Sequence, residues 1–311
     1  MSNVAAIDCG TNSTRLLVAD AEGRQIERRT TITRLGAGVD RTNRLDDAAI
    51  ARVANTLTDY RRRLDHHGID DPRTQVRVAA TSAARDATNA QALLDAIERA
   101  TGGATPELLT GEEEGRLSFA GATRDLDPAF GPYLVVDIGG GSTELVVGHG
   151  GHQDPTGIVS IDVGSVRLTE RYLHSDPPDP GELADALNVT RIHLDDVART
   201  MPQTLDAARL VGLAGSVTTV AAVELGLHTY DPNRIHHYVL TRKAAEDVFR
   251  TLATECAEDR AANPGLDPER VDVAVAGALI LVAVMRYFGF EECLVSEADL
   301  LEGMVQSLVR R

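Results

Sequence analysis

Apolar and polar positions along the chain form two kinds of pattern. Short apolar runs predict strands, and longer segments with apolar residues every three or four positions predict amphipathic helices. The expected strands are Val4–Ile7, Leu16–Ala19, Val76–Ala79, Leu134–Asp137, Leu145–Val147 and Leu210–Leu213. The expected helices are Asp46–His66, Ala90–Ala100, Pro180–Ala198, Arg242–Ala257 and Val271–Phe288. Because strands and helices alternate, the pattern predicts an α/β protein.

Segments rich in glycine and proline separate these elements and predict loops. They are Thr101–Pro106, Asp125–Pro132, His149–Pro155 and Ser175–Gly181. A chain of 311 residues is long enough for two domains of ordinary size. No apolar run is long enough to span a membrane, and the N-terminus has no leader pattern. The three cysteines form no disulfide framework, so we expect a cytoplasmic protein.

The formal net charge of −16 indicates which classes of binding partner are compatible with the protein surface. An acidic surface argues against binding to nucleic acid or an anionic membrane, both of which need a basic stripe. It is compatible with a small anionic ligand in one shielded pocket. Lys243 is the single lysine, so arginine supplies nearly all the basic groups. Arginine suits such a pocket because its planar group pairs bidentately with phosphate.

An internal repeat carries the strongest functional signal. Ile7–Val18 aligns without gaps on Val136–Val147, and each copy has an apolar strand, an aspartate, a glycine-containing turn with hydroxyls, and a second strand. This order differs from that of a Walker loop or a Rossmann turn. Such a hairpin offers backbone N–H groups and hydroxyls to phosphate, and its aspartate can hold Mg²⁺. Two copies predict two similar domains whose turns face a shared cleft.

Asp8–Ser13 and Asp137–Glu144 resemble the two phosphate motifs of the exopolyphosphatase/guanosine-pentaphosphate phosphatase family. Further segments match that family in order along nearly the whole chain. They are Arg34–Val39, Ala80–Ala87, Gly111–Leu117, Gly164–Glu170, Gly212–Ser216 and Ser296–Gly303. By this resemblance we expect the short form of the family, without the C-terminal helical domains of the long members. Its terminal motif, Asp299–Gly303, has no arginine where the family usually has one. The contacts of that arginine near the C-terminus are therefore not carried over, whereas the expectation for the catalytic cleft is unaffected.

The resemblance implies two ribonuclease-H-like domains of the actin, sugar-kinase and heat-shock-chaperone superfamily, arranged around a central cleft. We expect an N-terminal domain over residues 1–124 with the helix at 300–311 packed back on it, and a C-terminal domain over residues 125–299. In ATP-binding members of the superfamily, the motif matched by Gly212–Ser216 holds adenosine. Here it is equally consistent with a strand and a closely packed helix start.

The resemblance also assigns a catalytic residue. As a bare charge run, Glu112–Glu114 is typical of the first turn of a solvated helix. By resemblance, Glu114 is the catalytic base, and the neighbouring acidic charges at Glu112 and Glu113 raise its pKa toward a useful value. Arg85 is a surface arginine on sequence alone, whereas by resemblance it pairs with a phosphate.

The two turns and the family resemblance together assign the phosphate-binding and metal-binding residues. The phosphate-binding residues are expected to be Gly10, Thr11, Asn12, Ser13, Arg85, Gly139, Gly140, Gly141, Ser142 and Thr143. Asp8, Asp137 and Glu144 are expected to hold Mg²⁺ or Mn²⁺, because carboxylates around a polyphosphate need a cation between them. Arg15 stands where Glu144 stands in the other copy, so the two halves are not equivalent. Cys9 is expected to point into the core, and the histidine pairs 66–67 and 236–237 to be solvated.

The leading hypothesis is a Mg²⁺-dependent exopolyphosphatase that releases orthophosphate from short chains of inorganic polyphosphate. The close alternative is hydrolysis of pppGpp to ppGpp by the same chemistry. An ATP-dependent small-molecule kinase is a third enzyme class, and a nucleotide switch or a non-catalytic binder of polyphosphate or ppGpp is the non-enzymatic alternative. Homodimerisation is common in the family and is expected on that ground alone.

Overall fold

The structure is a computed structural model, and it describes residues 2–151 and 154–309. The chain divides into two compact units. Unit 1 comprises Met1–Gly121 and Leu300–Arg311, and unit 2 comprises Ala122–Asp299. The loop expected at His149–Pro155 includes residues 152–153, which lie outside the described residues. Among the described residues, no helix combines the length and apolar character needed to cross a membrane.

Unit 1 is built on a five-stranded mixed sheet with the order β3-β2-β1-β4-β5. Its strands are β1 (Val4–Cys9), β2 (Ser13–Ala19), β3 (Gln25–Ile32), β4 (Val76–Ala80) and β5 (Pro106–Leu108). The first three strands are antiparallel neighbours, and β4 and β5 run parallel to β1. The tight β1–β2 connection is the first copy of the sequence repeat.

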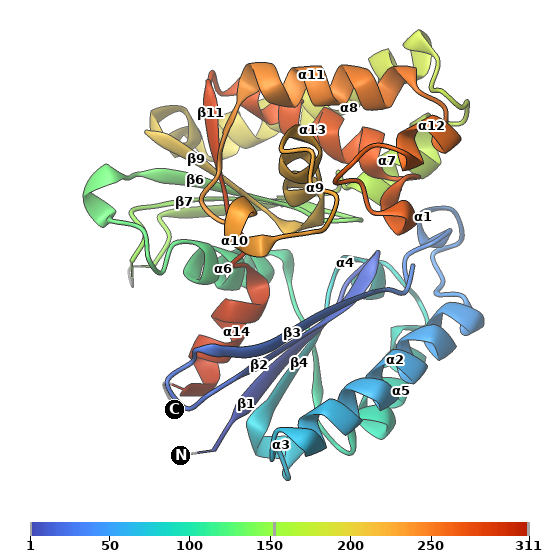
Figure 1. Ribbon diagram of the computed structural model, residues 1–311, viewed down its shortest axis with the longest axis vertical. Coiled ribbons are helices and arrows are strands. Elements are labelled where there is room, and N and C mark those ends of the chain that lie inside the picture. Colours follow the sequence, from blue (N-terminus) through green and yellow to red (C-terminus); the bar gives the residue numbers. More distant parts are fainter. Residues whose placement is uncertain (1, 152–153, 310–311) are drawn as a thin grey trace. The chain divides into compact units, whose positions relative to one another are not determined.

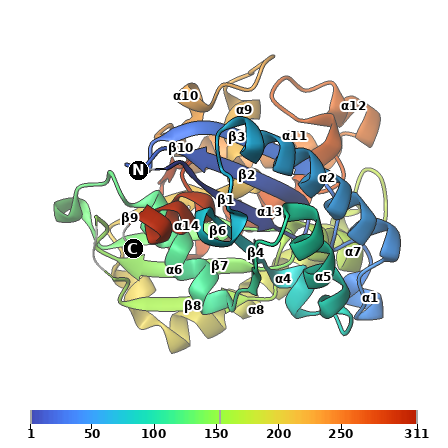
Figure 2. The same ribbon diagram turned by 90° about the horizontal axis from the view of Figure 1, so that it is seen from below.

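Helices cover both faces of this sheet, because successive side chains of each strand point to opposite faces. Ile7 and Val18 pack with α2 (Asp47–His66) and α5 (Ala90–Thr101) on one face. Ala6 and Leu17 pack on the other face with α6 (Gly111–Ala122) and α14 (Leu300–Val309). Figures 1 and 2 show α14, from the far end of the chain, beside β1 and β4. Short helices complete unit 1: α1 (Val39–Thr42), α3 (Pro72–Gln75) and α4 (Ser82–Arg85).

Unit 2 repeats this plan on a six-stranded sheet with the order β10-β11-β9-β6-β7-β8. Its strands are β6 (Tyr133–Ile138), β7 (Thr143–Gly148), β8 (Gly157–Ile161), β9 (Arg209–Leu213), β10 (Val239–Thr241) and β11 (Glu292–Val295). The strands β8-β7-β6-β9-β11 have the same order and the same relative directions as β3-β2-β1-β4-β5 of unit 1. Strand β10 is added at the edge, antiparallel to β11. The duplicated sequence therefore corresponds to a duplicated fold.

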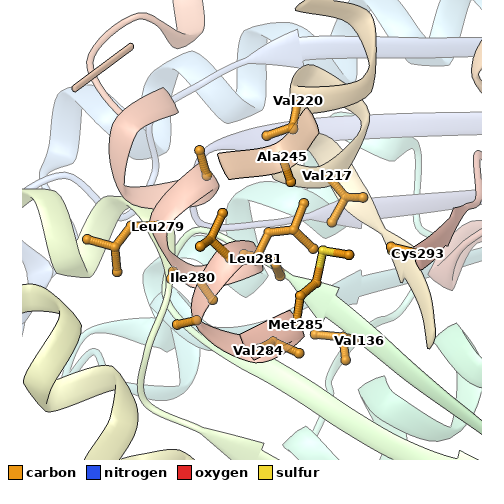
Figure 3. Packing of buried hydrophobic residues seen from close by; sticks show 14 of the residues in the cluster. Val136, Val217, Val220, Ala245, Leu279, Ile280, Leu281, Val284, Met285 and Cys293 are labelled. Carbon is orange, nitrogen blue, oxygen red and sulfur yellow. The ribbon is translucent and has the colours of Figure 1, made fainter. Parts of the chain in front are cut away.

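Helix α13 (Ala274–Tyr287) forms the centre of the core of unit 2. Every residue from Ala274 to Met285 is buried, as expected for a helix that is apolar all round. Figure 3 shows Leu281 and Met285 packed among side chains that include Val136 of β6 and Val217 of α9. The other helical segments of unit 2 are α7 (Ser165–Tyr172), α8 (Pro180–Thr200), α9 (Ala214–Glu224), α10 (Pro232–Ile235), α11 (Arg242–Thr254), α12 (Ala257–Ala261) and the 3₁₀ turns η1 (Pro128–Phe130), η2 (Pro202–Asp206) and η3 (Pro268–Arg270).

The expected α/β class is confirmed, and each expected strand and helix is present with shifted ends. The prediction was wrong at the end of α11, which stops at Thr254 because Glu255 and Cys256 adopt extended backbone before α12 begins. It was also wrong at the start of α13, which begins at Ala274, three residues after the expected position. Strand β3 was missed because its charged residues at 27–29 interrupt any apolar alternation.

Candidate active site

The two glycine-containing turns have the same backbone geometry. In the first turn, Gly10–Ser13, the Gly10 amide donates to the Ser13 carbonyl at 2.9 Å. In the second turn, Gly139–Ser142, the Gly139 amide donates to the Ser142 carbonyl at 3.0 Å. A Cβ on either glycine would lie 3.0–3.1 Å from that carbonyl oxygen, which is tighter than ordinary contact. Glycine therefore suits these two equivalent positions, because it has no Cβ that would crowd the carbonyl oxygen on the other side of the turn.

The residues beside the first turn form a buried ion pair. Asp8 of β1 lies directly opposite Arg15 of β2 in the antiparallel register. Arg15 donates to Oδ2 of Asp8 from Nε at 3.0 Å and from Nη2 at 2.7 Å. Asp8 is 3% exposed, and the guanidinium group of Arg15 compensates its negative charge within the fold.

The residues at the same places beside the second turn are both acidic. Asp137 of β6 lies directly opposite Glu144 of β7, and both side chains are buried. Ser160 of β8 donates to Oε1 of Glu144 at 2.7 Å. Because carboxylate oxygens are the ligands that Mg²⁺ prefers, this donor set fits a divalent cation better than Asp8, whose Oδ2 is bound by Arg15.

Glu114 lies in the first turn of α6, where the side chain of Thr110 accepts a hydrogen bond from the Glu113 amide at 3.2 Å. Arg85, at the end of α4, donates from Nη1 to Oε2 of Glu114 at 2.6 Å. The same Nη1 donates to the carbonyl of Leu109 at 2.9 Å. Arg85 thus fixes the Glu114 carboxylate, which is 9% exposed, and stabilises its ionised form.

The neighbouring acids do not act on Glu114 as unpaired charges. Oε1 of Glu112 lies 3.0 Å from Nη2 of Arg116. Glu113 lies 3.5 Å from Arg77 and 3.6 Å from Arg116. These arginines weaken the influence of both acidic charges on Glu114, and the expectation that Glu112 and Glu113 raise the pKa of Glu114 stays a prediction.

Two side chains expected at the phosphate have partners within the fold. The hydroxyl of Thr143 is fully buried and donates to the carbonyl of Val163 at 2.6 Å. The Nη1 group of Arg85 is bound to Glu114, as described above. The other expected phosphate-binding residues lie in or beside the turns, and Gly10, Asn12, Ser13, Gly139 and Gly140 are partly exposed there.

Sequence reasoning missed the roles of Arg15 and Ser160 as partners of the buried acids. The signal for Arg15 was present, because it replaces Glu144 in the aligned repeat. Ser160 gave no signal, because its place on β8 opposite Glu144 follows only from strand register. Cys9 lies in the core as expected, and burial and the nearby Asp8 charge raise the pKa of its thiol.

Asp125, His236 and His237 bring possible metal-binding atoms within 4.8 Å of one another in unit 2. The amide of Glu297 donates to Nδ1 of His236 at 3.2 Å. In the neutral ring the proton is therefore on Nε2, which faces Asp125 at 3.8 Å. With Nδ1 accepting and Nε2 protonated, this ring offers no lone pair to a cation at Nε2, so the cluster is a poor metal site.

The motif Gly212–Ser216 forms the end of β9 and the start of α9. Ala214 has a left-handed backbone with φ of 66°, and a Cβ on Gly215 would lie 1.8 Å from Nη1 of Arg270. The small residues of the motif therefore allow an arginine to pack against the start of α9. The motif thus contributes to local packing in unit 2.

Residues 17–311 match the Ppx/GppA phosphatase family, and the chain belongs to that family. Exopolyphosphatase 2 of Mycobacterium tuberculosis is 41% identical over 324 residues, which cover 99% of each chain. A crystal structure described as an exopolyphosphatase-like protein has a TM-score of 0.91 and 36% identity, with 99% of both chains covered. The Ppx/GppA enzyme of Aquifex aeolicus has a TM-score of 0.79 and 32% identity over 100% of this chain and 99% of its own. The family expected from the sequence motifs is thereby confirmed.

Proposed function

We propose that this protein is an exopolyphosphatase that hydrolyses the terminal phosphoanhydride bond of inorganic polyphosphate and releases orthophosphate. The observation that carries the proposal is the Arg85–Glu114 pair, which holds a buried carboxylate at the start of α6 in a chain of the Ppx/GppA phosphatase family. The 41% identity to an exopolyphosphatase supports polyphosphate as the substrate class.

Glu114 is the general base of the proposed reaction. Its carboxylate accepts a proton from a water molecule as the water oxygen attacks the terminal phosphorus atom. The bond from that phosphorus to the bridging oxygen breaks, and the electron pair leaves with the shortened polyphosphate. Arg85 holds the base in place through Nη1, and its positive charge is proposed to neutralise charge on the phosphate.

The two turns bind phosphate through their backbone amides and hydroxyls, at Gly10–Ser13 and Gly139–Ser142. A divalent cation, Mg²⁺ or Mn²⁺, neutralises phosphate charge when it is bound. Asp137 and Glu144 are the residues proposed to hold it, because they place two adjacent carboxylates on one face of the sheet. Asp8 makes a smaller contribution, since Arg15 already compensates its charge.

The acidic net charge of the protein favours short polyphosphate chains over long ones as substrates, because a long polyanion needs an extended basic surface to bind. Equal turnover of short and long polymers per chain end would contradict this preference. A cytoplasmic location, a homodimer and an effect of pppGpp or ppGpp remain predictions from the sequence and its resemblance.

The proposal is tested by measuring orthophosphate release from tripolyphosphate with Mg²⁺, with pppGpp and ATP as alternative substrates. Glu114→Gln removes the base, and Glu113→Gln is the matched control because it changes the adjacent residue in the same way. We expect Glu114→Gln to lower kcat by about 10²–10⁴-fold and Glu113→Gln to leave it nearly unchanged.

Each outcome of that assay has a distinct meaning. Faster turnover of pppGpp than of tripolyphosphate would replace the proposed substrate. Equal activity of the two glutamate variants would remove Glu114 as the base. Failure of wild-type protein to hydrolyse any of the three substrates would favour a non-catalytic binder, and phosphate transfer from ATP to an added acceptor would indicate a kinase.

A further inference from the structure

The segment after β8, residues 163–167, binds the carbonyl side of the second turn. The amide of Ser165 donates to the carbonyl of the turn's first glycine at 2.9 Å. The amides of Val166 and Arg167 donate to the carbonyl of its second glycine at 2.8 and 3.1 Å. The Nε group of Arg167 donates to the carbonyl of the third, Gly141, at 2.8 Å. Three successive carbonyls of the turn are thus directed toward this segment.

The direction of these carbonyls determines where the amides of the turn point. In a trans peptide, the N–H of the next residue points opposite to the carbonyl. The amides of Gly140, Gly141 and Ser142 therefore point away from residues 163–167. Successive N–H groups that point to one side form a concave site for an anion such as phosphate. The contacts on the carbonyl side thereby prepare the opposite side of the turn for phosphate.

The backbone of the second turn lies directly against Gly164. A Cβ at Gly164 would lie 2.4 Å from the carbonyl oxygen of Gly140, so any other residue would displace the turn. The side chain of Arg167 is 12% exposed, so its hydrogen bond to Gly141 is largely shielded from water. Three adjacent glycines have unusual backbone freedom, and external hydrogen bonds restrict it.

Unit 1 supports its own turn in an equivalent way. The Gly36 amide donates to the carbonyl of Thr11 at 2.8 Å. The amides of Thr33 and Arg34 donate to the carbonyl of Asn12 at 3.0 and 2.9 Å. These donors follow β3 as residues 163–167 follow β8. The recurrence in both halves indicates that the support belongs to the function of the turns, and unit 2 adds a side-chain donor to it.

We propose that Arg167 is a positioning residue, which holds the Gly139–Ser142 turn in the conformation that binds phosphate. This inference rests on the proposed phosphate-binding role of that turn. Arg167 acts through Gly141 and takes no part in the chemical step.

The test compares Arg167→Met with Arg171→Met, which removes the same charge from an exposed position on the same helix. We expect Arg167→Met to raise KM for tripolyphosphate about tenfold and to leave the pH profile of kcat unchanged, because a misplaced turn weakens binding while Glu114 is intact. Arg167→Lys, which keeps the charge and one donor group, should recover part of the loss. Hydrogen exchange of residues 138–143, measured by mass spectrometry without substrate, should be faster only in Arg167→Met.

The exchange measurement separates this inference from the proposed activity. Faster exchange together with a raised KM supports the positioning role. Exchange and KM equal to those of Arg171→Met would overturn it, and a raised KM with unchanged exchange would also overturn it by indicating direct contact with substrate. If wild-type protein lacks phosphatase activity, the affinity for tripolyphosphate replaces KM in the same comparison. Faster exchange with unchanged affinity or KM would overturn the role of Arg167 in phosphate binding.

Discussion

Arg15 donates two hydrogen bonds to a single carboxylate oxygen of Asp8, at 3.0 and 2.7 Å, across the register of β1 and β2. In the second half of the chain, the equivalent places hold Asp137 and Glu144. The first copy of the repeat therefore pairs its aspartate with an arginine, whereas the second copy places two acidic side chains opposite each other. We therefore expect the two halves to interact differently with the proposed substrate.

Replacement of Arg15 by glutamine should destabilise the protein strongly. The Asp8 carboxylate would remain buried without its charge partner, and breaking such a pair costs about 3–5 kcal/mol. The double variant Asp8→Asn/Arg15→Gln should recover much of this loss because no buried charge remains. Urea unfolding measures the free energy of unfolding, with the exposed Arg62→Gln as control. A loss no larger than that of the control would contradict the importance of the pair.

Loss of either acid beside the second turn should weaken metal activation. We expect Asp137→Asn and Glu144→Gln to raise the Mg²⁺ concentration needed for half-maximal activity by about tenfold or more, since each removes a hard oxygen ligand. Asp8→Asn should raise it less. Chelation with EDTA should abolish activity reversibly. Asp185→Asn, at an exposed acid on α8, is the control. An equal Mg²⁺ requirement in all four variants would exclude a cation held at Asp137 and Glu144.

The fold was largely predictable from the sequence because apolar runs in β1, β6 and β9 are buried and uninterrupted. The two turns were predictable because they are local and duplicated. Pairings between distant residues were not predictable in the same way. Arg85 and Glu114 are separated by 29 positions, and no periodicity indicates that the arginine would bind this carboxylate. Such pairs depend on how α4 and α6 pack, which is decided by the tertiary structure.

Asp176, in the loop between α7 and α8, should make the free energy of unfolding depend on pH. The pKa of its carboxyl group is lowered by a hydrogen bond from the Ala257 amide and by the positive charge of the Arg260 guanidinium. The unfolded chain therefore binds more protons between that lowered value and the ordinary value of about 3.9, and stability rises with pH across this window. Above it, Asp176→Asn should be less stable than wild type, and the difference should shrink as pH falls below about 4.

Unfolding in urea at pH 7, 5 and 3 measures this difference, and Asp185→Asn, an exposed acid on α8, serves as control. A destabilisation by Asp176→Asn that is the same at pH 7 and at pH 3 would show that the carboxylate charge contributes nothing. The buried side chain of Arg260, 7% exposed, provides the reason to expect otherwise, because it donates to Oδ1 of Asp176 at 2.6 Å.

Gly303 on α14 should affect catalysis through α6. A Cβ at this position would lie 2.1 Å from the carbonyl oxygen of Leu117, so Gly303→Ala must separate the two helices. Leu117 is on the helix that carries Glu114, one turn away, and the shift should displace this proposed base. We expect a loss of about 1–3 kcal/mol in the free energy of unfolding and a fall in kcat larger than the change in KM.

The matched control for Gly303→Ala is Gly181→Ala on α8, because a Cβ at Gly181 meets no atom within 4 Å. That substitution should leave kcat unchanged and stabilise the protein by about 0.4–1 kcal/mol, since alanine loses less backbone freedom than glycine on folding. Thermal unfolding and steady-state kinetics on both variants give the comparison. If Gly303→Ala retains wild-type kcat while losing stability, α14 acts as a structural support alone; a fall in kcat confined to Gly303→Ala would support a role of α14 in positioning Glu114, the proposed base.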